Sequence, residues 1–68
     1  MSGVFSSEAA ASDARRWLVD NRPAPKVVRA AARDANAAQT IAAAAGDRQR
    51  AGYWAAYRAE LLAAIEAR

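Results

Sequence analysis

Alanine restricts the fold of this chain more than any other residue type. The 68 residues include 22 alanines, and only 15 of the others are larger hydrophobic residues. Alanine has the highest helix propensity because it loses no side-chain entropy when a helix forms. Threonine occurs once, and no segment alternates between apolar and polar residues as a half-buried strand does. We therefore expect an all-α fold.

Prolines and glycines divide the chain into three helical segments within one small domain, residues 1–68. We expect helices over about 6–21 and about 25–45, and a third helix that begins between 47 and 53 and continues to about 67. A proline-rich break at 22–25 and a turn or loop at 46–52 separate them.

Local signals place the ends of the first helix. Ser6 is a predicted N-cap, and Val4 and Phe5 before it are expected to fold back as a hydrophobic staple. Proline disfavours the α region for the residue that precedes it. We therefore predict that Arg22 and Ala24, which precede the two prolines, are extended.

One face of the second helix is built from small residues that recur at alternating spacings of three and four. This alanine seam consists of Val28, Ala31, Ala35, Ala38, Ala42 and Ala45. Small residues let another helix approach closely, and large residues on that helix must fill the contact. The third helix carries such residues on one face, at Trp54, Tyr57, Leu61 and Ile65. We expect an antiparallel hairpin of helices two and three, with these residues forming either the core or a self-association surface.

The other large hydrophobic residues are expected around this contact. Trp17 is predicted to anchor the first helix against the open side of the hairpin. Val27 and Ile41 flank the alanine seam and are expected to widen its apolar face. Val19 and Leu62 fall off the apolar stripes of their helices, so we expect both to be exposed.

The composition excludes most catalytic and metal chemistry. The chain has no cysteine and no histidine, which removes thiolate nucleophiles and the commonest general base and metal ligand. No two of its seven acidic residues are three or four positions apart. We assign no catalytic, cofactor-binding or metal-binding residue and expect a protein that is not an enzyme. Because no apolar run approaches the roughly 20 residues of a membrane span, we expect no membrane contact and a cytoplasmic location.

A basic stripe marks the start of the second helix and consists of Arg22, Lys26, Arg29 and Arg33. Lys26 and Arg29 lie in the first turns, where the helix dipole is already positive, so helix stability does not favour them. Cations at a helix N-terminus suit an anion, either a phosphate or the carboxylates of a protein partner. A third interpretation is a solvated face that keeps an alanine-rich chain soluble.

A helix-turn-helix motif is the alternative, nucleic-acid hypothesis. Gly46 is expected to end the second helix, and Asp47 is expected to cap the third. The DNA contacts would then come from Arg48, Arg50 and Arg58. The pattern departs from that motif because Gly52 stands where a branched apolar residue is expected, and because the helix before the turn is too long.

The scarcity of large hydrophobic residues leads to a functional expectation. A small chain with a thin core gains apolar contacts by associating with a second copy or with a partner. We expect a non-enzymatic interaction or adaptor module that forms a homodimer and binds a protein partner, of the kind that serves in regulation or with mobile elements. The alternative is a small basic DNA-binding regulator.

Overall fold

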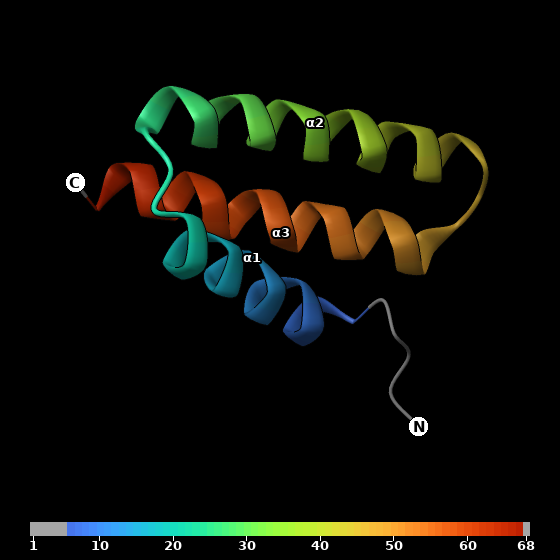
Figure 1. The fold of residues 1–68 in the computed structure, drawn as a ribbon. Coiled ribbons are helices and arrows are strands. Elements are labelled where there is room, and N and C mark those ends of the chain that lie inside the picture. Colours follow the sequence, from blue (N-terminus) through green and yellow to red (C-terminus); the bar gives the residue numbers. More distant parts are fainter. Residues whose placement is uncertain (1–5, 68) are drawn as a thin grey trace.

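The computed structural model describes residues 6–67, which form three helices. They are α1 (Ser7–Asn21), α2 (Pro25–Ala44) and α3 (Arg48–Glu66). No strand occurs in the described residues, so the expected all-α fold is confirmed. Figure 1 shows α2 and α3 as an antiparallel hairpin, with α1 lying along one side of α3. The expected staple residues Val4 and Phe5 lie outside the described residues.

The N-terminal end of α1 matches the prediction from the sequence, and its C-terminal end does not. Ser6 is the N-cap, and its hydroxyl accepts a hydrogen bond from the backbone N–H of Ala9 at 3.1 Å. Arg22 is not extended but left-handed, with φ 45° and ψ 54°. Its N–H donates to the carbonyl of Leu18 at 2.9 Å and closes the last turn of the helix. The prediction was wrong because proline disfavours only the right-handed α region, whereas Ala24 is extended as expected.

The connection between α2 and α3 is shorter than the turn or loop predicted over 46–52. Gly46 has φ 78°, the conformation that ends many helices, and so it turns the chain directly after α2. Asp47 caps α3 by accepting a hydrogen bond from the N–H of Arg50 at 3.0 Å. With this cap the helix begins at Arg48, and Gly52 lies in its second turn.

The last helix of the chain occupies the middle of the molecule. Both α1 and α2 pack on α3, and no Cα atom of α1 lies within 8 Å of a Cα atom of α2. A helix between two others must present apolar side chains in two directions. This explains why Leu62, expected to be exposed, is half-buried and packs against the core.

The core is formed where the three helices meet. Ala14 of α1, Val28 and Ala32 of α2 and Leu61 of α3 make one buried cluster. Half-buried residues surround this cluster, and they are Trp17, Leu18, Ala31, Tyr57, Leu62 and Ile65. Of the candidate core residues on α3, Tyr57, Leu61 and Ile65 belong to this cluster or pack against it, whereas Trp54 does not.

The buried face of α2 overlaps the alanine seam but is not identical with it. Ala35 and Ala42 are buried, as Val28 is, while Ala31 and Ala38 are half-buried. Ala45 is exposed because it lies at the end of the helix. The sequence pattern missed Ala32, which is buried one turn after Val28. Val27 and Ile41 do not widen the contact, because both are exposed.

Gln39 of α2 is half-buried. The side-chain oxygen of Gln39 is buried and has no hydrogen-bond partner among residues 6–67. A buried acceptor without a donor costs free energy, so Gln39 opposes the packing around it.

Polar contacts also join α1 to α3. The Tyr53 hydroxyl donates to an Asp13 carboxylate oxygen at 2.6 Å, and Arg15 forms an ion pair with Glu60 at 2.9 Å. Burial, together with the hydrogen bond to Asp13, raises the pKa of Tyr53 to about 12. The pKa of Tyr57 is also raised, by burial and by the negative charge of Asp13.

Replacing Ala35 with leucine tests the packing of α2 on α3. Ala35→Leu should lower the free energy of unfolding by about 1–3 kcal/mol, because the close contact has no room for added methylene groups. Ala37→Leu adds the same volume on the exposed side of α2 and should change it by less than about 0.5 kcal/mol. Urea denaturation measures both, and the reverse ranking would show that the buried face is wrongly assigned.

The Tyr53–Asp13 contact predicts a loss of stability at alkaline pH. The folded state raises the pKa of Tyr53 from 10.0 to about 12, so it favours the neutral phenol. Its contribution is therefore complete below pH 10.0 and is lost as the pH rises toward 12. Tyr53→Phe should show a smaller decline of the unfolding free energy across this range. Equal declines in the two proteins, measured by urea denaturation at each pH, would contradict this linkage.

Candidate functional site

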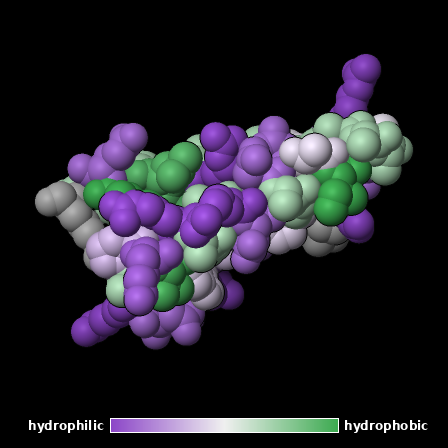
Figure 2. Space-filling model, turned by 90° about the horizontal axis from the view of Figure 1, so that it is seen from above, coloured by the Kyte–Doolittle hydropathy of each residue, from purple (hydrophilic) through white to green (hydrophobic). Residues whose placement is uncertain are grey.

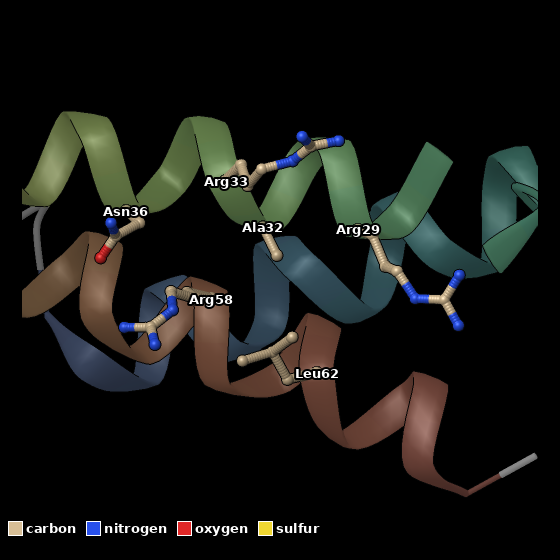
Figure 3. Close-up of a pocket in the computed structure, with 6 residues that line it drawn as sticks. All are labelled: Arg29, Ala32, Arg33, Asn36, Arg58 and Leu62. Carbon is tan, nitrogen blue, oxygen red and sulfur yellow. The ribbon is translucent and has the colours of Figure 1, made fainter. Parts of the chain in front are cut away.

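An open pocket of about 420 Å³ lies in the groove between α2 and α3. We call it the arginine groove, and its lining residues are Arg29, Ala32, Arg33, Asn36, Arg58 and Leu62. Figure 3 shows Ala32 and Leu62 facing each other between the two helices. The guanidinium groups of Arg29 and Arg58 extend in opposite directions along the groove, and Arg33 stands at its outer edge.

Helix periodicity explains why these side chains share one surface. Arg29, Arg33 and Asn36 follow one another at spacings of four and three, so they lie on one face of α2. Arg58 and Leu62 are four residues apart and lie together on α3 in the same way. The antiparallel hairpin brings the two faces side by side, which makes a cationic rim around an apolar floor.

The cations of the groove have no acidic partners among the residues that the structure describes. Arg29, Arg33 and Arg58 make no ion pair and no side-chain hydrogen bond with any residue between 6 and 67. Asp34 is the only acid of α2, and it does not line the groove. Three guanidinium groups around one groove repel one another, so the fold gains no electrostatic stability from their placement.

The structure divides the predicted basic stripe. It brings Arg29 and Arg33 together with Arg58, which the sequence had assigned to the alternative DNA contacts. Arg22 and Lys26 are exposed and do not line the groove.

The remaining predicted cations lie near the start of α3. Arg48 is exposed in the first turn of the helix. Arg50 lies beside Asp47, with 3.8 Å between Arg50 Nε and Asp47 Oδ2. Neither residue lines the arginine groove. The groove therefore takes Arg29 and Arg33 from the predicted basic stripe and Arg58 from the predicted DNA contacts.

The apolar floor of the groove was not predicted from the sequence. Leu62 was expected to be exposed, and Ala32 was not placed on the buried face. The sequence indicated the position of Leu62 only by its spacing of four residues from Arg58, which places an apolar residue and a cation on one face of the helix. That spacing gains meaning only when the register of α2 against α3 is known.

The arginine groove is suited to holding an anion with an apolar group beside it. A guanidinium group presents N–H donors in a planar fork that matches a carboxylate or a phosphate. The Asn36 amide adds a donor and an acceptor at the same rim. Within residues 6–67, no three acidic residues gather as ligands for a metal ion.

Two further observations concern the hydropathy of the helices and the similarity of the chain to known proteins. None of the helices in the described part of the chain combines the length and the apolar character needed to cross a membrane. Comparison of the chain with models of protein families, with curated proteins and with solved structures found no match.

Proposed function

We propose that this protein is a non-enzymatic interaction module that binds an acidic segment of a protein partner in the arginine groove. The observation that carries this proposal is the set of three guanidinium groups, unpaired among the described residues, around a floor of Ala32 and Leu62. A ligand can bind such cations without breaking an ion pair between described residues.

The apolar floor favours a protein segment over a bare phosphate. Leu62 is half-buried and still lines the open groove, so an apolar side chain placed on it would gain contact area. An amphipathic helix with glutamates beside leucines offers both kinds of group at matching spacing. A phosphate backbone would use the cations but would leave the floor without a partner.

The geometry of α3 gives less support to the DNA-binding alternative. A recognition helix must present polar side chains to the bases from a free surface. The exposed hydrogen-bond donors Arg48, Gln49 and Arg50 are confined to the first turn of α3, and the exposed residues beyond it, Gly52, Ala59, Ala63 and Glu66, have no side-chain donor. Its aromatic residues are half-buried against the rest of the molecule.

Fluorescence anisotropy with a labelled peptide tests the proposal. The probe is a synthetic amphipathic helix of leucine, glutamate and alanine, and a scrambled peptide of the same composition is its comparison. Arg29→Glu combined with Arg58→Glu should weaken binding of the helical peptide by about tenfold or more, which corresponds to at least about 1.4 kcal/mol. The double variant should remain folded, because both arginines lack partners in the described structure.

The matched control changes the same charge elsewhere on the surface. Arg16→Glu combined with Arg48→Glu alters two exposed arginines outside the groove and should retain most of the binding. Equal losses in the two double variants would show that only net charge matters and would overturn the proposal. Random duplex DNA bound more tightly than the peptide, with affinity falling steeply as salt rises, would favour the nucleic-acid alternative.

A further inference from the structure

A second surface lies at the end of the hairpin, where α2 turns into α3. Its pocket of about 280 Å³ is lined by Ala38, Ile41, Ala42, Ala45, Asp47, Arg50 and Trp54. We call it the hairpin-end patch. Ile41 is 71% exposed, more than any other large hydrophobic residue between 6 and 67. The patch therefore combines an exposed aliphatic side chain with a hollow of small residues beside it.

The arrangement of the helices leaves this patch open. Figure 1 shows that α2 and α3 extend beyond α1 at the end where they are connected. Figure 2, which looks down on α2, shows hydrophobic residues at that end and also toward the opposite end, with hydrophilic residues between them. Within the described structure, α1 packs on α3, and no Cα atom of α1 lies within 8 Å of a Cα atom of α2.

The core of the single chain is thin enough to benefit from a further apolar contact. Between residues 6 and 67, the buried residues are all alanines apart from three, which are Pro23, Val28 and Leu61. Alanine contributes little apolar area on burial, so much of the burial in this fold comes from small side chains. Covering Ile41 and the edge of Trp54 would add larger ones.

The charges at the rim favour a second copy of the same chain as the occupant. Asp47 and Arg50 lie side by side there, so the rim carries one negative and one positive charge. Two identical surfaces related by a twofold axis place each charge of one copy against the surface of the other. A rim with both signs is self-complementary, whereas two arginine grooves would repel each other.

We propose that two copies of the chain associate through the hairpin-end patch with twofold symmetry. Ile41 of each copy packs into the hollow beside Trp54 of the other copy. Asp47 and Arg50 of one copy lie opposite Arg50 and Asp47 of the other. A dimer built in this way buries the most exposed large side chain of the described structure.

This dimer leaves the arginine groove available. The patch and the groove have no lining residue in common. Their residues on α2 span 29–36 and 38–45, so the centres of the two surfaces are about 13 Å apart along the helix at 1.5 Å per residue. Each dimer therefore presents two grooves, and self-association is independent of the proposed ligand.

Sedimentation equilibrium over a range of protein concentrations tests the proposed dimer. The wild-type mass should rise from monomer to dimer at micromolar concentrations, and the melting temperature should rise with protein concentration. Ile41→Glu should raise the dimer dissociation constant by at least about tenfold. Its circular dichroism should match that of wild type, because Ile41 makes little contact within its own chain.

Val19→Glu is the matched control, because Val19 on α1 is 69% exposed and lies outside the patch. It should dimerise as the wild type does. Arg50→Glu gives the rim two negative charges and should weaken the dimer, while an acid in the first turn suits the helix dipole and keeps the monomer folded.

Three results would overturn the proposal. The first is a wild-type protein that stays monomeric up to millimolar concentration. The second is a dimer that Val19→Glu weakens as much as Ile41→Glu does. The third is a folded Ile41→Glu variant whose dimer is as stable as that of the wild type.

Discussion

The close contact between α2 and α3 governs the rest of this structure. α2 presents a face of small residues, and α3 fills it with larger side chains such as Leu61 and Tyr57. A face of alanines cannot span a wide gap, so the two helices must lie close together. This closeness leaves little tolerance for added volume, and the short connection between Ala44 and Arg48 makes the hairpin antiparallel.

The features that we connect with function follow from this contact. Residues too long or too polar for the contact lie along its edges, where Arg29 and Arg33 of α2 meet Arg58 of α3. Among the described helices, the short α1 packs along α3 and does not extend to the connected end of the hairpin, where Ile41 and Trp54 lie. The edge of the contact is therefore cationic, and the connected end of the hairpin is apolar. We propose a ligand site at the first surface and a dimer contact at the second.

The sequence predicted the helices and their pairing well because both depend on local periodicity. The alternation of three and four along α2 included its buried residues Val28, Ala35 and Ala42 but missed Ala32. Ser6, Gly46 and Asp47 marked helix ends by their own chemistry. Arg22 was placed wrongly, because its left-handed conformation depends on how α1 must end before Pro23.

The candidate site was only partly predictable, because it depends on two helices at once. Arg29 and Arg33 belong together by spacing on one helix. Their association with Arg58 depends on the register of α3 against α2, which no local pattern contains. Leu62 illustrates the same limit, since its exposure changes when α3 is placed between two helices instead of at the edge of the fold.

The dependence of folding stability on salt tests most directly whether the arginine groove serves binding and not the fold. Unpaired cations repel one another, and raising the salt from about 0.01 M to about 0.15 M shortens the screening length from about 30 Å to about 8 Å. The free energy of unfolding of the wild-type protein should therefore rise over this range, and it should rise less in Arg58→Gln. A wild-type stability that falls with salt, or that rises no more than in Arg58→Gln, would show that these arginines are part of the electrostatic stabilisation of the fold.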